Sequence, residues 1–340
     1  MQNENSACRR TSIGGQALIE GIMMRGPKKT SVCCRIADGN ITTDIINDKR
    51  IKDKVKILGW PLIRGIVNLV ESMKLGYKAL MISADKSLDE EEDKKEEKES
   101  AKKGGIPAPV MSVLMVIAAI IGVVIAFALF AYLPSFLFDF INERTNLSIT
   151  GFKTLFEGVL KIGIFVGYIA LIAMMKDIKR MFMYHGAEHK TIFCYEHGEE
   201  LTVENVRKYK RFHPRCGTSF MILMLIVSIV VSSILGLAFD DLLMPKMRIF
   251  WVIIKILLVP IICGLGYELI KVCGKYDNKL TRIISAPGMW MQHLTTKEPD
   301  DSMIEVAIQA LKEVLPGDNS DIIDIPGHKG INTNDLAPNS

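Results

Sequence analysis

Four long apolar runs dominate the pattern of hydrophobic and polar positions along the chain. They lie at roughly 110–133, 155–175, 219–239 and 249–270. A helix needs about 20 mostly apolar residues to cross a bilayer, and each run reaches that length. The pattern therefore predicts four transmembrane helices.

Shorter patterns flank these runs. Between residues 12 and 50, "TSVCCRI" and "ITTDIIN" are strand-like, and "ADGN" between them supplies turn residues. Near the other end, "DDSMIEVAIQALKEVL" has the periodicity of an amphipathic helix, with apolar positions at Met303, Val306, Ala307, Ala310, Leu311 and Val314. The predicted fold class is mainly α and integral to the membrane, with a small N-terminal β element and a C-terminal cytoplasmic helix.

Residues 56–82 form a further helical pattern that is less apolar than the four runs. Arg64, Glu71 and Lys74 interrupt it after Pro61. These charges favour an interfacial or re-entrant helix. A fifth membrane segment and a soluble amphipathic helix remain as alternatives.

Changes of composition divide the chain into five segments. The mixed-charge run that follows the interfacial helix is typical of a solvated linker, and the Gly-, Asp-, Asn- and Pro-rich tail after Pro316 is expected to be disordered. The segments are an N-terminal cytoplasmic β-containing segment (1–55), the interfacial helix (56–84), the charged linker (85–109), a membrane domain with a histidine-rich hairpin at 176–218 (110–298), and the C-terminal helix and tail (299–340).

The distribution of basic residues predicts how the chain is oriented in the membrane, and its cysteines fit a reducing compartment. Basic residues concentrate between the second and third runs and after the fourth, so the positive-inside rule predicts that both termini and the hairpin lie in the cytoplasm. The seven cysteines form no evident disulfide framework, and the first 50 residues lack the apolar region of a signal peptide. A net charge of +4 does not indicate a nucleic-acid partner. Membrane lipids are the expected partners, and no protein partner is indicated.

The candidate chemistry lies in "MYHGAEHKTIFC", residues 183–194. No proline separates this stretch from the second run, so the helix is expected to continue into it. His185, Glu188 and His189 then project to one side, because residues three and four apart are neighbours on a helix. Two imidazoles at this spacing can hold a divalent ion, and a His-x-x-Glu-His pattern with a glutamate base occurs in inverzincin proteases. Gly186 would let another backbone or a substrate approach.

Three further ligand types are expected at the same membrane face. The second and third runs are antiparallel, so His213 and Cys216 at the entrance of the third lie near the exit of the second. Glu268 lies at the cytoplasmic end of the fourth run, where an ionisable group usually faces a partner. His197 and His293 share this face, and we expect the first at the surface and the second at the membrane interface.

These residues favour a metal-dependent hydrolase at the cytoplasmic face of the membrane. The expected ion is divalent, with zinc as the first choice, and Glu188 would accept a proton from water activated by the metal. Placement at the boundary suggests a lipid-linked substrate or a membrane peptide. The expected ligands are His185 and His189, with His213, Cys216 or Glu268 as the third.

Two alternatives remain open. If His185, His189, His213 and Cys216 all bind the ion, no position is left for water and the zinc is structural, as in a membrane scaffold or assembly factor. A transporter is less favoured, because the central charges of the runs are mainly Lys161 and Lys255.

Four motifs give a family resemblance. "GGQALIEGIMMRGP", "YHGAEHKTIFCYE", "RFHPRCGTSF" and "APGMWMQHLTTKEPDDSMIEVAIQAL" resemble the YqhQ-like bacterial membrane proteins, over about residues 12–315. The resemblance implies an integral protein of the bacterial cytoplasmic membrane, described as a predicted metal-dependent enzyme with no established reaction. The first motif carries polar residues in an apolar stretch, which fits either a packed, glycine-bounded helix or loop with surface charges or a segment that covers the metal site. The polar residues of the motifs are Gln16, Glu20, Arg25, His185, Glu188, His189, His213, Cys216 and Glu268.

Overall fold

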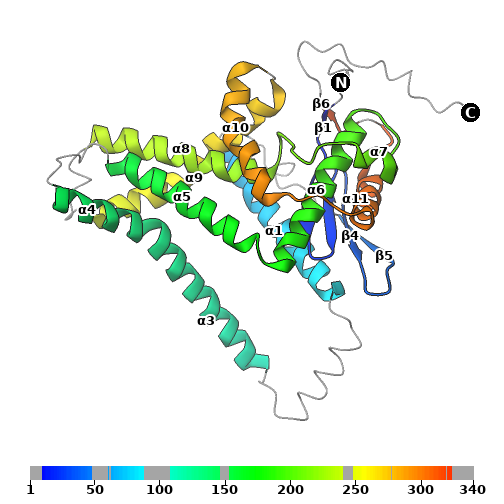
Figure 1. The fold of residues 1–340 in the computed structure, drawn as a ribbon, viewed down its shortest axis with the longest axis horizontal. Helices are drawn as coiled ribbons and strands as arrows, with labels where there is room; N and C mark the ends of the chain where they lie inside the picture. The colour runs from blue at the N-terminus through cyan, green and yellow to red at the C-terminus, as the bar shows by residue number, and fades with distance from the viewer. Residues whose placement is uncertain are drawn as a thin grey trace, which may run out of the picture. The chain divides into compact units, whose positions relative to one another are not determined.

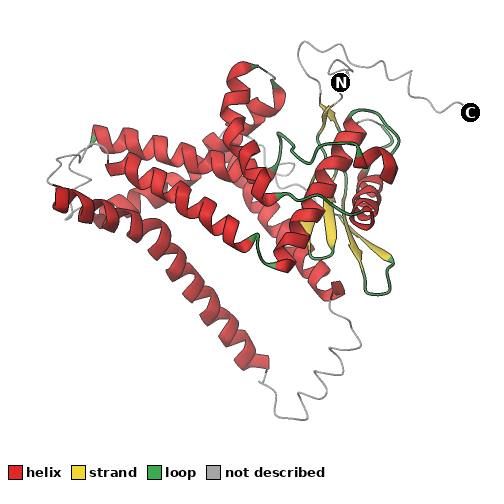
Figure 2. Ribbon diagram, viewed as in Figure 1, coloured by secondary structure: helices red, strands yellow, loops and turns green. Residues whose placement is uncertain are grey.

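The protein is mainly helical, with a small sheet near its N-terminus (Figures 1 and 2). The structure is a computed structural model and describes residues 10–47, 60, 63–87, 108–145, 153–239, 248–276, 278–318 and 320–323. The fold class predicted from the sequence is confirmed. Most of the predicted linker at 85–109 lies outside the described residues.

The described residues form short strands at both ends and helices between them. The strands are β1 (Arg10–Thr11), β2 (Gly14–Leu18), β3 (Gly21–Arg25), β4 (Thr30–Arg35), β5 (Ile41–Ile46) and β6 (Ile322–Ile323). The helices are α1 (Ile63–Ser87), α3 (Ala108–Phe127), the π-helical η3 (Ala128–Tyr132), α4 (Leu133–Thr145), α5 (Lys153–Ile172), α6 (Lys176–Glu196), α7 (Val203–Arg207), α8 (Gly217–Ala238), α9 (Arg248–Lys275), α10 (Lys279–Thr295) and α11 (Asp301–Val314).

The chain divides into two compact units. One combines Met1–Ser87, Ile172–Leu223 and Cys263–Ser340. The other combines Leu88–Leu171 and Met224–Ile262. All the candidate site residues from the sequence belong to the first unit.

The sheet of the first unit is an antiparallel meander in the order β2-β3-β4-β5. The two predicted strands are confirmed as β4 and β5, and Gly39 in their turn has a φ of 86° that favours glycine. The glycine-bounded stretch before them, which is not predicted as strands, is the hairpin of β2 and β3. Its turn holds Glu20 at a φ of 47°.

Helices cover both faces of this sheet. Successive side chains of a strand point to opposite faces, so the neighbours Cys33 and Cys34 enter different cores. Cys33 packs in a cluster with residues of α6 and α11, whereas Cys34 packs in a cluster with Leu75 and Ala79 of α1. The apolar positions predicted for the C-terminal helix are all buried in α11, which confirms that pattern.

The beginning of the C-terminal tail is ordered, which corrects the predicted disorder for this part. Ile322 and Ile323 of β6 pair with β1. The buried carboxylate of Asp321 accepts hydrogen bonds from the Thr11 hydroxyl (2.6 Å) and the Tyr195 hydroxyl (2.9 Å). These contacts to β1 and α6 hold the chain in place. The tail beyond residue 323 lies outside the described residues.

Four helical segments of the described chain are long and apolar enough to cross a membrane. They are Ile120–Arg144, Lys153–Ile172, Gly217–Leu235 and Ile256–Cys273, and they suggest a multi-pass membrane protein. The first extends further toward the C-terminus than the predicted run, because the helix continues through η3 into α4. Helix α1 is not among them.

The second span and the histidine helix are two helices, which corrects the predicted continuous one. Helix α5 ends at Ile172, and α6 begins at Lys176 after Met175 adopts an extended conformation with a ψ of 136°. No proline or glycine marks the break. Helix α6 packs its own buried face against α11 and β2.

Candidate metal centre

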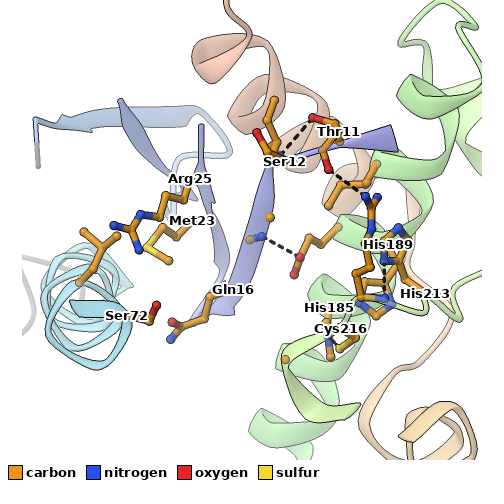
Figure 3. Close-up of a pocket in the computed structure, with 18 of the residues that line it drawn as sticks. Thr11, Ser12, Gln16, Met23, Arg25, Ser72, His185, His189, His213 and Cys216 are labelled. Carbon is orange, nitrogen blue, oxygen red and sulfur yellow. Dashed lines mark hydrogen bonds between the residues drawn. The ribbon is translucent and has the colours of Figure 1, made fainter. Parts of the chain in front are cut away.

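Helix α6 carries the central part of the site. From Tyr184 to Glu196 nearly every residue of α6 is buried, because the helix lies between the sheet, α11 and α7. His185, Glu188 and His189 share one side of it, as the spacing predicts. Figure 3 shows His185, His189, His213 and Cys216 gathered on one side of a cavity.

Backbone carbonyl groups orient the two α6 imidazoles. His185 donates its Nδ1–H to the Thr295 carbonyl (2.8 Å), and His189 donates its Nδ1–H to the Arg211 carbonyl (2.5 Å). In both residues Nε2 is then the ring nitrogen that is available to a metal ion. Metal-binding histidines usually have this arrangement, because the second nitrogen then fixes the tautomer and the ring orientation.

Cys216 completes a group of three ligand atoms. Its Sγ lies 3.1 Å from His185 Nε2, and one ligand atom each from His185, His189 and Cys216 lie within 4.8 Å of one another. These three residues could hold a metal ion. Helix α8 begins at the next residue, so Cys216 is placed by the first turn of that helix.

The charges within this group favour the thiolate form of Cys216. Burial opposes the thiolate of Cys216, but the imidazoles of His185 and His189 outweigh it and hold the Cys216 pKa well below its usual range. Burial opposes the imidazolium of His185, but the adjacent Cys216 and Glu188 raise the His185 pKa to about 9. The thiolate is the form of cysteine that binds metals.

The two carboxylate oxygens of Glu188 differ in their hydrogen bonding. Its Oε1 accepts a hydrogen bond from the Gly15 N–H of β2 (3.0 Å). Its Oε2 is buried and has no hydrogen-bond partner among the described residues. Burial raises the pKa of Glu188, and the nearby His185 and His189 oppose the rise only in part.

Gly15 makes this contact possible. A Cβ at this position would lie 2.9 Å from the Glu188 carboxyl carbon and 2.7 Å from the Met23 carbonyl oxygen. Real Cβ atoms do not approach other atoms so closely. The motif "GGQALIEGIMMRGP" therefore contacts the candidate site directly, through the backbone N–H of Gly15.

His213 lies beside the group with one bonded ring nitrogen, Nδ1, and one, Nε2, that has no hydrogen-bond partner among the described residues. Its Nδ1 accepts from the Arg215 backbone N–H (3.3 Å), and its Nε2 lies 3.6 Å from the Glu196 carboxylate. Burial lowers the His213 pKa to about 4 despite the opposing effect of Glu196. Glu196 also pairs with the Arg215 guanidinium and accepts from the Thr11 N–H (2.9 Å). His213 thus belongs to a neighbouring hydrogen-bond network.

The structure does not bring Glu268 into the three-residue group. Both of its carboxylate oxygens accept from the Arg64 guanidinium, at 2.6 and 2.5 Å, and this pair joins α9 to α1. His197 is exposed, as expected. His293 is also exposed, and its ring lies 4.4 Å from that of Phe212, centroid to centroid.

The polar residues of the first motif connect β2 and β3 to helices. Glu20 accepts from Arg180 of α6 through both carboxylate oxygens (2.5 and 2.6 Å). Arg25 lies 3.5 Å from the Glu71 carboxylate of α1. The Gln16 side chain lies against α1 at Gly76. Of these three, Gln16 and Arg25 also line the cavity.

The cavity beside the group has a volume of about 580 Å³. His185 and His189 lie on one side of it, and Gln16, Arg25 and Ser72 lie on the other (Figure 3). Glu188 also lines the cavity. Asn68 and Leu75 of α1 and Tyr267 of α9 also line it. Tyr267 falls within the candidate span Ile256–Cys273, so the cavity reaches the level of a membrane helix.

The missing side chain of Gly186 lets another backbone segment approach α6, which confirms one of the two possibilities predicted for this residue. A Cβ there would collide with the Lys297 carbonyl oxygen. The Lys297 N–H also donates to the Phe182 carbonyl (2.8 Å), so the segment after α10 runs along α6. This segment follows directly on Thr295, whose carbonyl orients His185.

We therefore expect Gly186→Ala to destabilise the protein by about 1–3 kcal/mol, the usual cost of forcing extra atoms into a packed site. Thermal unfolding of the purified protein measures the effect. Gly163→Ala on α5 is a matched control, since a Cβ there meets nothing within 4 Å. Equal melting temperatures for both variants would contradict the close contact.

Several residues of the site carried no signal in the sequence. The carbonyl groups of Thr295 and Arg211 act through backbone atoms that every residue has. Gln292 of α10 is fully buried, and its side-chain amide exchanges two hydrogen bonds of 2.7 Å with the His213 backbone. The pattern of apolar and polar residues over 279–295 does not indicate that Gln292 has such a partner.

The comparisons with known proteins agree with the predicted resemblance. Residues 60–317 match the model of a family described as protein of unknown function (DUF1385). The chain is 33% identical over 305 residues to the uncharacterized protein YqhQ of Bacillus subtilis (strain 168), which covers 89% of this chain and 92% of that protein. No solved structure matches the chain. The chain belongs to the DUF1385 family.

Proposed function

We propose that this protein is a metal-dependent hydrolase that works at the cytoplasmic face of the bacterial membrane. His185, His189 and Cys216 hold one divalent ion, and zinc suits a site of two imidazoles and a thiolate. The observation that carries the proposal is the convergence of these three ligand atoms within 4.8 Å. The fixed tautomers of both imidazoles support it further.

Two observations favour a catalytic site over a closed structural one. Catalytic zinc sites typically use three protein ligands and leave a position open, whereas structural sites use four. His213, the nearest candidate for a fourth ligand, lies outside the group of three ligand atoms, and its Nε2 lies 3.6 Å from the Glu196 carboxylate. The group also borders the 580 Å³ cavity, where a substrate has room.

Glu188 is the residue that moves the proton. Its Oε1 is held by Gly15, and its Oε2, which has no partner among the described residues, accepts a proton from water. The same carboxyl group then returns the proton to the leaving group. The bound metal ion supplies Lewis-acid activation of water near neutral pH.

The walls of the cavity indicate where the substrate comes from. Tyr267 belongs to a candidate span, and Asn68 and Ser72 belong to α1, which is joined to that span by the Arg64–Glu268 pair. A substrate that is itself anchored in the membrane reaches such a cavity without leaving the bilayer. Lipid-linked molecules and membrane peptides both meet this condition.

Metal analysis of the purified protein tests the proposal. We expect about one equivalent of metal in the unaltered protein and none in the double variant His185→Ala/His189→Ala, because one thiolate cannot hold the ion alone. His197→Ala is the matched control, since this histidine is exposed. Full metal in the double variant, or none in the unaltered protein, would refute the site.

A second candidate function follows from the contact between Cys216 and His185. Sγ and Nε2 are 3.1 Å apart, the Thr295 carbonyl orients the imidazole, and Cys216 precedes the first turn of α8. Nucleophilic cysteine enzymes use this arrangement of thiol, base and orienting group. In that case Cys216 attacks an acyl carbon and His185 carries the proton, without a metal ion.

The orientation of the protein in the membrane is a further prediction. A membrane-impermeant maleimide should label a cysteine introduced at Asn146, between the first two spans, in intact cells. It should label one introduced at Lys208 only after the cells are opened, because the basic hairpin is expected inside. The reverse pattern would place the candidate site outside the cytoplasm.

A further inference from the structure

Helix α10 has three distinct sides. One side is buried and includes Gly288 and Gln292. A second side is apolar yet exposed, with relative exposures of 65% for Leu280, 70% for Ile283 and 58% for Trp290. These three residues, spaced three and seven apart, form one continuous arc, which we call the apolar arc.

Basic residues border the apolar arc. Lys279 and Arg282 are both exposed and lie on the third side of the helix. A helix with an apolar strip next to basic side chains is typical of segments that lie in the plane of a membrane surface. A tryptophan in the strip fits the same place, because tryptophan is enriched at membrane–water interfaces.

The chain places α10 at the membrane boundary. The candidate span in α9 ends at Cys273, and α10 starts at Lys279 behind an Asn278 N-cap, whose side chain accepts from the Thr281 N–H (2.9 Å). The turn between the two helices is therefore short. The first apolar residue, Leu280, follows the span too closely to lie far from the headgroups.

Contacts on the buried side keep the apolar arc facing outward. Gly288 is packed so tightly against α8 that a Cβ would lie 2.5 Å from the Ser219 Cβ. The Gln292 amide bonds to both the His213 backbone and the Ser219 hydroxyl (3.0 Å). Helix α10 cannot rotate to bury its apolar arc without breaking these contacts.

The same three-sided pattern occurs on α1, which is also attached to α9. Val70, Met73 and Tyr77 are exposed by 56%, 67% and 67%, and Lys74 borders them. At its N-terminal end, a Cβ on Gly65 would lie 3.0 Å from the Gly264 Cα in the candidate span. The pattern recurs at a second helix in contact with the same span.

We propose that α10 lies in the interface of the membrane that α9 crosses, with the apolar arc among the lipid chains and Lys279 and Arg282 on anionic phospholipid headgroups. The partner of this surface is the bilayer. The buried side of the same helix supplies the Thr295 carbonyl and Gln292 to the candidate site. Helix α10 thus holds the site at the headgroup level, whatever reaction the site performs.

Tryptophan fluorescence tests this placement. The full chain with Trp60→Phe and Trp251→Phe, which leaves Trp290 alone, is placed in nanodiscs of phosphatidylcholine and phosphatidylglycerol. Bromine atoms on the upper lipid chains should lower Trp290 emission roughly twofold, because an interfacial ring lies next to them. A variant with Trp290→Phe and Lys208→Trp, in the same background, is the control and should not respond to bromine.

Two results would overturn the proposal. Trp290 emission that does not change with brominated lipid but is quenched by acrylamide would show that the apolar arc faces water. Trp290 emission that neither bromine nor acrylamide lowers would show that protein covers the apolar arc. If the double Phe variant does not fold, the difference in bromine quenching between the unaltered protein and Trp290→Phe gives the same answer.

Discussion

Replacing Glu188 with glutamine should abolish function and leave the metal in place. The amide has nearly the size of the carboxylate, and its oxygen can still accept from the Gly15 N–H, so the site keeps its shape. It cannot accept a proton from water, and loss of such a base costs about 10²–10⁴-fold in rate. Complementation of a deletion strain under envelope stress, together with metal analysis, measures both effects.

Glu199→Gln is the matched control, since Glu199 is an exposed carboxylate just beyond the end of α6. It should complement fully. Full complementation by Glu188→Gln would rule out the hydrolase mechanism, whatever the metal content. Loss of metal in Glu188→Gln would instead make Glu188 a ligand.

Replacing Cys216 with alanine should remove the metal. Loss of a partner that only orients a ligand costs roughly 10–100-fold in metal affinity, and loss of one of three ligands should cost more. Competition with a chelator of known affinity measures the change. Cys194→Ala is the matched control, because Cys194 is a buried thiol on α6 outside the three-residue group. An unchanged affinity in Cys216→Ala would remove the thiolate from the metal site.

Alkylation of Cys216 separates the two candidate functions. A thiolate bound to metal should react slowly with iodoacetamide, and it should react faster after a chelator has removed the ion. A nucleophilic thiolate paired with His185 should react rapidly in protein that contains no metal, with no change on chelator treatment. The two mechanisms therefore predict opposite responses to the chelator.

The sequence predicted most elements whose cause is local. The buried positions of α11 follow from helical periodicity, and the strands β4 and β5 follow from alternation and the Gly39 turn. The candidate spans follow from length and apolar content. Each of these depends on neighbours in the chain.

Features caused by distant contacts were not predictable. The break between α5 and α6 occurs in an apolar stretch, because α6 packs on β2 and α11. The strand β6 forms because Asp321 is bonded to Thr11 and Tyr195.

The site shows the same division. Its imidazoles and thiolate were visible as residue types, and the expected proximity of Cys216 to His185 is found in the structure. The carbonyl groups of Thr295 and Arg211, and the Gly15 N–H that holds Glu188, belong to backbone atoms. The positions of these backbone groups depend on the tertiary fold, so the residue types do not predict them. The Arg64–Glu268 pair likewise depends on α1 lying against α9.

X-ray absorption spectroscopy on the purified, detergent-solubilised protein tests the central claim most directly. The proposed site predicts about one metal ion per chain with one sulfur and two imidazole nitrogens, plus a light ligand that exchanges with added anions. The sulfur signal should vanish in Cys216→Ala. A shell without sulfur, a shell of four protein ligands, or a protein that binds no metal would contradict the proposed centre of His185, His189 and Cys216.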